Sequence, residues 1–288
     1  MSDVVAVIAP GEMGSAVGRR LVERGVRVVT RLDGRSKASI ARAERSGFAV
    51  AGSDAQLAQE AGIVLSIVPP GAALGLAERL APALAAAAAK PVYVDCNAVA
   101  PETAERIGAV IARTGCRYVD AGIIGPPPSA SARTVFYASC ADARVLARLG
   151  DRGLTVRVLD GPIGAASALK MSYAGITKGV TALGAAMMLG AERTGAASAL
   201  RQELAESQPV LLAYLARQVP AMFPKAYRWV AEMEEIAAFL AADPAAPQIY
   251  RGIAKLYQRF ADELGTAPEP PPRGELAALA DFYREAKK

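Results

Sequence analysis

The sequence contains no histidine among its 288 residues, and this absence narrows the chemistry available to the protein. Imidazole is the usual proton carrier near neutral pH, so serine and cysteine triads and dehydrogenases with a histidine–carboxylate pair are excluded. Acid–base chemistry near pH 7 is therefore left to lysine, tyrosine, cysteine and carboxylate side chains.

Cysteine is also scarce. Cys96, Cys116 and Cys140 are scattered and match neither a disulfide framework nor the spacing of a zinc site. We therefore expect a reduced, cytoplasmic protein that binds no metal. We expect no signal peptide, because the first residues, MSDVVAVIAPGEMG, lack a basic start, carry Asp3 and Glu12, and are typical of a strand.

Basic runs and long apolar runs are missing as well. The net charge is only +5, and no lysine or arginine run alternates with aromatic residues, so nucleic acid is not an expected partner. The longest uncharged stretch, AGIVLSIVPPGAALGLA, is interrupted by Pro69, Pro70 and glycines, which excludes a single membrane-spanning helix there. A hydrophobic content of 52% with 21% charged residues fits a soluble globular protein and no membrane partner.

Short apolar runs separated by helical stretches fill the chain to about residue 160: VVAVIA, VRVVT, IVLSIV, PVYVDC, RYVDAGII, TVFYAS and LTVRVL. This alternation predicts parallel β-α-β units with helices on both faces, which is an α/β, Rossmann-type doubly wound sheet. Beyond residue 161 only helical periodicity remains, with a long helix from near Pro162 past Met188. Further helices are expected near 198–218, 225–242, 247–264 and 274–286. We predict a dinucleotide-binding domain over 1–161 and an all-α domain over 162–288.

The stretch AVIAPGEMGSAVGRRL, residues 6–21, reads as a buried strand, a glycine turn and a helix. Gly11 and Gly14 have the spacing of the second and third glycines of a dinucleotide fingerprint, while Ala9 replaces the first. A helix that begins at such a turn binds a pyrophosphate through its amide groups and its positive end. We expect Gly11, Glu12, Met13 and Gly14 to bind the cofactor. The alternative is an ordinary β-α turn whose glycines serve packing.

The second strand ends in VVTRLDGRSKAS, where NAD-binding units place an acidic residue on the ribose hydroxyls. Cations and a hydroxyl suit a 2′-phosphate better, so NADP is favoured, with NAD left possible. The alternative is a solvated basic loop. The residues expected to bind this part of the cofactor are Thr30, Arg31, Arg35, Ser36 and Lys37.

Five motifs then occur in order: the methionine of GEMG, SIVPP, VDCNAVAP, YVDAGIIG and GPIGAASALK. Together they resemble the β-hydroxyacid dehydrogenase and 6-phosphogluconate dehydrogenase superfamily over the first domain and the start of the long helix. The resemblance implies that Val68 and Pro69 pack on the nicotinamide ribose. It places Asn97 at a serine position near the nicotinamide and the substrate; the alternative for Asn97 is a turn or helix cap.

The last motif implies a catalytic role for Lys170, since Gly161 and Gly164 precede it at the family's spacing. The residues agree, because Lys170 is the only charge in AASALKMSYAG, and desolvation there is expected to lower its pKa. The alternative is a structural lysine whose amine reaches water.

Two departures from the family concern the substrate. Ala174 replaces an asparagine, with Tyr173, Thr177 and Lys178 nearby on the same helical face. The sequence IIGPPP replaces Ser-Gly-Gly, so the usual carboxylate capture loses its hydroxyl and an amide, which indicates a bulkier or less acidic substrate. The residues expected to bind substrate are Asn97, Gly122, Ile123, Gly125, Tyr173, Ala174 and Thr177.

The carboxyl-terminal stretch AYRWVAEMEEIAAFL resembles an uncharacterised helical domain that follows such nucleotide domains in unassigned bacterial dehydrogenases. One of Glu232, Glu234 and Glu235 is expected to point inward. The apolar segment ITKGVTALGAAMMLGA predicts a homodimer, because few charges protect any face of it.

These observations lead to an NADP-preferring oxidoreductase that transfers hydride between nicotinamide and a hydroxyl or carbonyl carbon of a small-molecule substrate. The helical domain is expected to close the active site. Two alternatives stay open: an imine reductase, which shares this architecture, and an inactive NADP-binding sensor or structural dimer.

Overall fold

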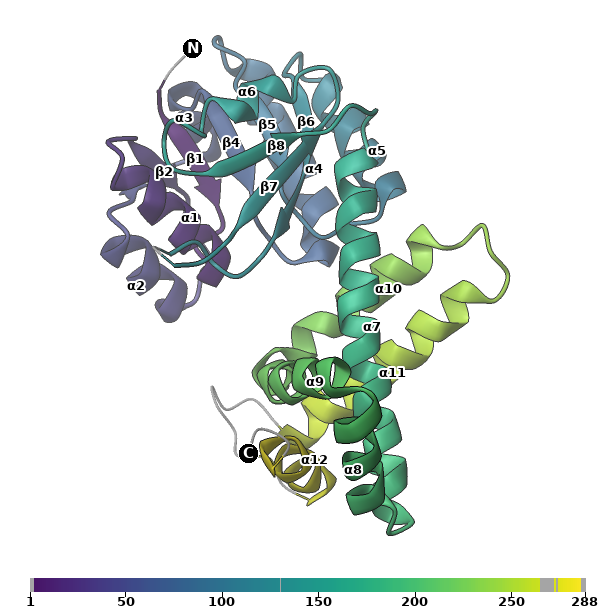
Figure 1. Cartoon of the computed structure of the whole chain (residues 1–288). Coiled ribbons are helices and arrows are strands. Elements are labelled where there is room, and N and C mark those ends of the chain that lie inside the picture. The colour runs from purple at the N-terminus through teal and green to yellow at the C-terminus, as the bar shows by residue number, and fades with distance from the viewer. Residues whose placement is uncertain (1–2, 130, 265–271, 273, 286–288) are drawn as a thin grey trace. The chain divides into compact units, whose positions relative to one another are not determined.

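The computed structural model describes residues 3–129, 131–264, 272 and 274–285 (Figure 1). The chain divides into two compact units, Met1–Met171 and Ser172–Lys288. The division falls inside helix α7 (Ala165–Arg193), whereas the sequence placed the domain boundary after residue 161. Because helical periodicity begins near Pro162, the sequence could not show that the first turns of this helix pack with the nucleotide domain.

The first unit contains an eight-stranded sheet in its described residues, ordered β3-β2-β1-β4-β5-β6-β7-β8. The strands are β1 (Val5–Ile8), β2 (Val28–Thr30), β3 (Ala49–Val50), β4 (Ile63–Ser66), β5 (Val92–Asp95), β6 (Tyr118–Ile124), β7 (Val135–Ser139) and β8 (Thr155–Val158). The helices are α1 (Glu12–Val22), α2 (Lys37–Arg45), α3 (Asp54–Glu60), η1 (Pro70–Ala72), α4 (Ala73–Ala86), α5 (Pro101–Ala112) and α6 (Arg144–Ala147). The predicted doubly wound fold is confirmed.

Two details of the sheet differ from the prediction. The sequence missed β3, which has only two residues. It also treated all strands as parallel, but β6 and β7 are antiparallel. The segment that joins them, residues 125–134, contains three consecutive prolines and is shorter than the dozen or more residues that a parallel crossover needs.

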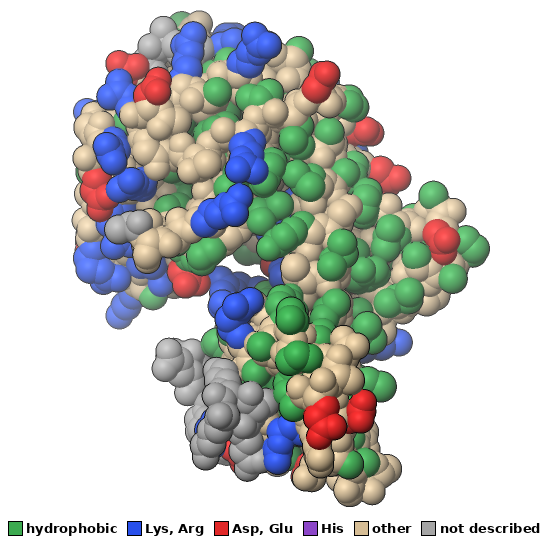
Figure 2. Space-filling view, in the orientation of Figure 1, with side chains coloured by type: hydrophobic (Ala, Val, Ile, Leu, Met, Phe, Trp, Pro, Cys, Tyr) green, Lys and Arg blue, Asp and Glu red, His purple; other side chains and the backbone are tan. Residues whose placement is uncertain are grey.

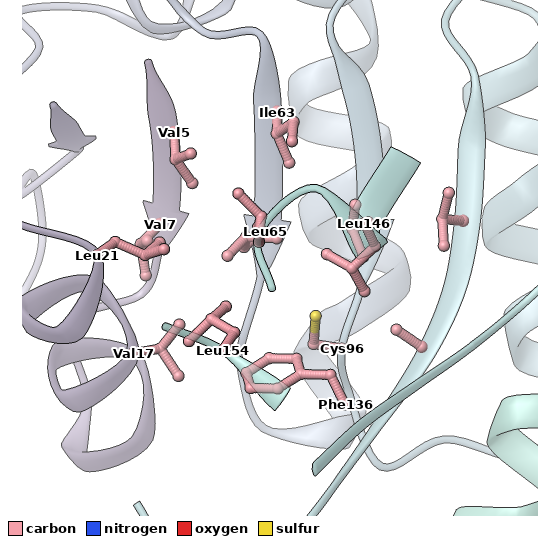
Figure 3. Close-up of a cluster of buried hydrophobic side chains, with 14 of the residues drawn as sticks. Val5, Val7, Val17, Leu21, Ile63, Leu65, Cys96, Phe136, Leu146 and Leu154 are labelled. Carbon is pink, nitrogen blue, oxygen red and sulfur yellow. The ribbon is translucent and has the colours of Figure 1, made fainter. Parts of the chain in front are cut away.

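The core of this unit lies on both faces of the sheet. Along β1, Val5 and Val7 belong to one hydrophobic cluster and Ala6 and Ile8 to the other. This alternation is the period of two that a strand imposes, and both faces are buried because helices cover each of them. Figure 3 shows one cluster, in which side chains of α1 and of the strands converge.

The second unit is helical. It contains the later part of α7, α8 (Ala197–Ser207), α9 (Pro209–Met222), η2 (Phe223–Lys225), α10 (Ala226–Phe239), α11 (Ala246–Leu264) and α12 (Gly274–Glu285). The helix predicted at 198–218 is two helices, because Pro209 begins α9 and cannot extend α8. Small residues of α7 allow close packing, since a Cβ at Gly175 would lie 3.0 Å from the hydroxyl oxygen of Tyr250.

Helix α7 meets the length and hydropathy criteria of a membrane span, with a mean hydropathy of 1.2 over its most apolar window. Of that window, 44% is buried inside the protein. A helix packed in a protein core meets the same criteria, so composition alone does not assign α7 to a membrane.

Figure 2 shows the charged side chains on one face of the first unit. On the face in Figure 2, lysine and arginine side chains lie among apolar and uncharged polar ones and form no continuous band. This face therefore lacks the basic stripe that nucleic-acid-binding proteins present.

Candidate active site

The glycine turn after β1 presents the amino end of helix α1. Gly11 occupies the amino-terminal cap position of this helix. No side chain accepts a hydrogen bond from the first amides of the helix there. A Cβ at Gly11 would meet no protein atom within 4 Å, whereas one at Gly14 would collide with the carbonyl oxygen of Ala9. The two glycines therefore differ in role: Gly14 permits packing of the turn, and Gly11 leaves open space in front of the helix. A pyrophosphate fits such a space and such a helix end.

Ala9 occupies the position of the missing first glycine. Among the described residues, only Lys90 and Cys140 combine a side chain with a positive φ. The turn at Ala9 therefore uses backbone angles that alanine accepts, and it does not require glycine.

The polar residues at the end of β2 mostly hold the turn itself. The buried Thr30 hydroxyl donates to the carbonyl oxygen of Val7 at 2.7 Å. Arg31 forms an ion pair with Asp33, lies 3.7 Å from a carboxylate oxygen of Asp54, and donates to the Gly52 carbonyl. These two predicted cofactor residues thus have partners in the protein.

The other three predicted residues at this edge lie in or beside the first turn of α2. Ser36 caps that helix by accepting from the Ser39 amide at 3.3 Å, and the Lys37 side chain is exposed. Arg35 is half-buried, and burial together with the positive charge of Arg79 on α4 lowers the pKa of Arg35. Arg79 also lies 3.6 Å from a carboxylate oxygen of Asp54, which offsets part of its positive charge.

Arg42 is a residue that the sequence did not single out. From α2 its Nε donates to the carbonyl oxygen of Pro10 at 3.2 Å, and its Nη2 donates to the Ser39 hydroxyl at 3.1 Å. A cation is therefore fixed beside the glycine turn. The sequence could have indicated Arg42 only through its position on the face of α2 that lies toward the glycine turn. That position is known only once β1 is seen to pair with β2.

Asn97 links the ends of β4 and β5. Its Oδ1 accepts from the Val68 amide at 2.6 Å, and its Nδ2 donates to the Ser66 hydroxyl at 2.8 Å and to the Asp95 carboxylate. The side chain is 3% exposed. Asn97 therefore holds the segment at Val68 in place, with Val68 half-buried and Pro69 exposed.

Asp120 on β6 is the second residue that the sequence missed. One carboxylate oxygen, Oδ2, accepts from the amides of Gly164, Ala166 and Ser167 at 2.9–3.1 Å. The Ser139 hydroxyl also donates to Oδ2 at 3.0 Å, and the Ser167 hydroxyl donates to Oδ1 at 2.6 Å. The carboxylate thus caps the first turn of α7, although it belongs to a strand distant in the sequence.

Lys170 lies one turn further along α7, against the same strand. A Cβ at Gly122 would lie 3.0 Å from both the Ala166 carbonyl oxygen and the Cβ of Lys170. Glycine at 122 is therefore what allows the helix to lie so close to β6. The Lys170 side chain is half-buried.

The segment that replaces Ser-Gly-Gly folds back toward β7. Ile123 is buried, Ile124 is half-buried, and Gly125 has a φ of +121°. The Thr134 hydroxyl donates to the Pro126 carbonyl oxygen at 2.6 Å. No described side chain of this segment before residue 129 supplies a hydroxyl group.

Further candidates belong to the helical unit. Ala174 is buried, Tyr173 is 50% exposed, and the Thr177 hydroxyl donates to the Tyr173 carbonyl within α7 at 2.8 Å. Lys178 forms an ion pair with Glu232, and its amine lies 4.8 Å from the ring centre of Trp229. Of the three glutamates, Glu232 and Glu235 are half-buried and Glu234 is exposed.

Two cavities lie away from these residues. One of about 450 Å³ is lined by Val5, Ile63 and Arg148, at the amino ends of β1 and β4. Another of about 830 Å³ is lined by Cys140, Arg144 and Asp160. Neither contains the glycine turn or Lys170. The described residues include no group of three or more cysteine, aspartate and glutamate side chains placed to hold a metal ion.

Comparison with known proteins gives matches to both parts of the chain. Residues 4–151 match the family described as the NAD binding domain of 6-phosphogluconate dehydrogenase, and residues 191–260 match a domain of unknown function, DUF1932. The 3-hydroxyisobutyrate dehydrogenase of Pseudomonas aeruginosa is 32% identical over 140 residues, which are 48% of this chain and 45% of that protein. The match thus spans about half the length of that relative.

Solved structures cover more of the chain. A conserved protein of unknown function, described as similar to 3-hydroxyacid dehydrogenases, is 31% identical over 90% of this chain and 97% of its own, with a TM-score of 0.69. The 3-hydroxyisobutyrate dehydrogenase of Mycobacterium tuberculosis, at 19% identity and full coverage of both chains, has a TM-score of 0.73. An imine reductase of Streptomyces aurantiacus, at 19% identity and 99% coverage of both, has a TM-score of 0.53. The last two show the fold alone.

The family match covers the glycine turn and both strands whose ends carry Val68 and Asn97, as the sequence motifs predicted. Because this match spans residues 4–151, the chain belongs to the family described as the NAD binding domain of 6-phosphogluconate dehydrogenase.

Proposed function

We propose that the protein is an NADP-preferring oxidoreductase that transfers hydride between nicotinamide and a carbon bearing a hydroxyl or carbonyl group, with Lys170 as general acid–base. The observation that carries this proposal is the position of Lys170. In a chain without histidine, a half-buried lysine lies against β6, where Gly122 lets the helix approach the strand.

The reaction divides into tasks for particular residues. Bound NADP(H) would supply or accept the hydride. The open amino end of α1 at Gly11 binds the pyrophosphate, and the link between Asn97 and Val68 fixes the segment that packs on the nicotinamide ribose. The Lys170 ammonium group gives a proton to the carbonyl oxygen in reduction, and its amine takes one from the hydroxyl group in oxidation.

Preference for NADP rests on the cations near the adenosine side of the glycine turn. Arg42 is fixed beside Pro10, and the half-buried Arg35 lies at the same edge. A 2′-phosphate would accept charge-assisted hydrogen bonds from these guanidinium groups, whereas the ribose of NAD carries no charge at that position. Arg31 contributes less directly, because it is already paired with Asp33.

The substrate is expected to be bulkier or less acidic than a small hydroxy acid. Gly122, Ile123 and Gly125 offer backbone groups and an apolar surface, and Pro126 has no amide to donate. An aldehyde or ketone fits this lining better than a carboxylate, which requires a hydroxyl group or cation that residues 122–128 do not supply.

The test replaces Lys170 with methionine, which keeps the aliphatic length and removes the proton donor. Turnover of whichever aldehyde, keto acid or cyclic imine supports NADPH oxidation should fall by about 10²–10⁴-fold, while the Kd for NADPH stays the same. Lys255→Met, on an exposed part of α11, is the matched control. Near-full activity of Lys170→Met would refute the assignment. Turnover of imines alone would favour the imine reductase alternative, and none at all would favour the sensor.

A homodimer is the second part of the proposal. On α7, Tyr173, Ile176, Leu183 and Met187 are 50–67% exposed. Their spacing of three, seven and four residues sets them along one side of the helix, which is the pattern of a helix packed on a second helix. A second copy of the chain would cover this stripe.

Light scattering tests the dimer at micromolar concentration. A double variant, Leu183→Glu with Met187→Glu, should convert a dimer to a monomer, because buried unpaired carboxylates are costly. Ile249→Glu, at an equally exposed apolar position on α11, should leave the mass unchanged. A wild-type monomer would contradict this part of the proposal.

A further inference from the structure

The first turn of α7 lacks a cap of its own. The residues before it are Gly161, Pro162, Ile163 and Gly164, none of which has a side chain that accepts hydrogen bonds. Gly164 has a φ of +97°, so the chain turns sharply at the helix start. A helix that begins in this way leaves its first amides without partners unless another part of the chain supplies an acceptor.

Asp120 supplies that acceptor. Its carboxylate accepts from the amide of Gly164, just before the helix, and from the α7 amides of Ala166 and Ser167. The hydroxyl groups of Ser139 and Ser167 also donate to it, and the side chains of Asp120, Ser139 and Ser167 are at most 1% exposed. The Ser139 hydroxyl oxygen also accepts from the Ala166 amide at 3.0 Å. The negative charge at the positive end of the helix adds to the hydrogen bonds.

We propose that Asp120, through Ser167, is a positioning residue that sets the rotation of α7 and so holds the Lys170 amine in place over β6. Asp120 and Gly122 share one face of β6, because alternate residues of a strand do so. Ser167 and Lys170 share one face of α7, because they are three residues apart. The Ser167–Asp120 hydrogen bond fixes the rotation of the helix, and the contact of Gly122 with Ala166 fixes its distance from the strand.

The catalytic consequence rests on the proposed role of Lys170. Proton transfer needs the amine within hydrogen-bond reach of the reacting oxygen, and a misplacement of about 1 Å can cost about 100-fold in rate. Ser167→Ala removes the bond that fixes the rotation but leaves the three amide bonds to Asp120. The variant should therefore fold and lose about 10–100-fold in kcat, with the KM for NADPH unchanged.

Thr114→Ala is the matched control, since Thr114 is also a buried hydroxyl residue of the first unit. Its Oγ1 donates to the Ile111 carbonyl oxygen at 2.6 Å and accepts from the Cys116 amide, at the end of α5. This variant should lower the melting temperature and leave kcat unchanged. An equal loss of kcat in Thr114→Ala would mean that general destabilisation, not positioning, explains the Ser167 result.

A double variant separates positioning from stability. In the Lys170→Met background, Ser167→Ala should change the residual rate by less than about twofold, because the residue it positions is gone. Its effect on melting temperature should persist in that background. The same 10–100-fold loss of rate in both backgrounds would overturn the proposal.

Amine labelling gives a readout that does not depend on turnover. Trace acetylation with acetic anhydride, read by mass spectrometry, compares Lys170 with the exposed Lys255 in each variant. Ser167→Ala should change the relative labelling of Lys170 by at least about twofold, and Thr114→Ala should not. Changed labelling with an active Lys170→Met enzyme would refute the proposed function and keep the positioning role. Unchanged labelling with unchanged kcat in Ser167→Ala would overturn the positioning role even if Lys170→Met were inactive.

Discussion

Two variants of the glycine turn, Gly11→Ala and Gly14→Ala, distinguish its role in cofactor binding from its role in folding. Gly11 has φ −68° and ψ −170°, angles that alanine adopts, and a Cβ there meets no protein atom within 4 Å. At Gly14 the added Cβ collides with the backbone carbonyl of Ala9, which cannot rotate away as a flexible side chain would.

We therefore expect Gly14→Ala to lower mainly the stability of the fold and Gly11→Ala to lower mainly the affinity for NADPH. Forcing an extra carbon against the backbone costs about 1–3 kcal/mol, which lowers the melting temperature by about 2–12 °C in a unit of this size. Exchanging glycine for alanine at a helix cap costs about 0.5–1 kcal/mol, or about 1–4 °C. At Gly11 the new methyl group occupies the space that the pyrophosphate needs. Losing one charge-assisted hydrogen bond, about 1.5–3 kcal/mol, raises the Kd for NADPH by about 10–140-fold.

Thermal unfolding by circular dichroism and NADPH titration by fluorescence measure the two effects on the same samples. We expect Gly11→Ala to bind NADPH weakly and melt near the wild type, and Gly14→Ala to melt early. Wild-type NADPH affinity in Gly11→Ala would refute the assignment of this turn as the pyrophosphate site. An unchanged melting temperature in Gly14→Ala would refute the packing argument.

Three further predictions concern other parts of the chain. Arg42→Ala should raise the Kd for NADPH by about tenfold and change that for NADH little, as measured by calorimetry, and equal losses would contradict a 2′-phosphate contact. Ion pairs with Arg193 and Arg259 hold the pKa of Glu275 at about 2, below its ordinary 4.5. Their contribution to stability is therefore present above pH 4.5 and disappears as the pH falls toward 2. In Glu275→Gln, stability should not show this loss between pH 4.5 and 2. Identical pH profiles of stability in the wild type and the variant would contradict this prediction. The buried Tyr118 hydroxyl has no hydrogen-bond partner among the described residues, so Tyr118→Phe should leave the melting temperature unchanged or raise it. A clear fall in the melting temperature would contradict this prediction.

Much of the fold could be predicted from local pattern. Apolar runs at strand length, separated by helical stretches, predicted the doubly wound sheet because each β-α unit is a local structure. The same reasoning failed at β6 and β7, where the connection is too short and too rich in proline for a parallel crossover. It also merged α8 with α9, although Pro209 was a signal for the break.

Only some residues of the candidate site could be singled out from the sequence. The spacing of Gly11 and Gly14 along the chain predicted the glycine turn, which is a local structure. The resemblance to a family motif and the apolar surroundings singled out Lys170, and its role stays a prediction. Arg42 and Asp120 gave no such signal. Each is an ordinary charged residue in its own segment, and its partner lies on a different element.

The sequence alone determined that a dinucleotide turn, a long apolar helix and a histidine-free set of proton donors occur in this chain, because those properties need only neighbouring residues. The tertiary structure decided which polar groups meet. Val68 bonds to Asn97 across 29 residues, Arg42 to Pro10 across 32, and Asp120 to Gly164 across 44. These partners come together because the strand order β2-β1-β4-β5-β6 aligns the ends of distant segments at one edge of the sheet. That order arises from the pairing of strands distant in the sequence, such as β1 with β4, which no single segment contains.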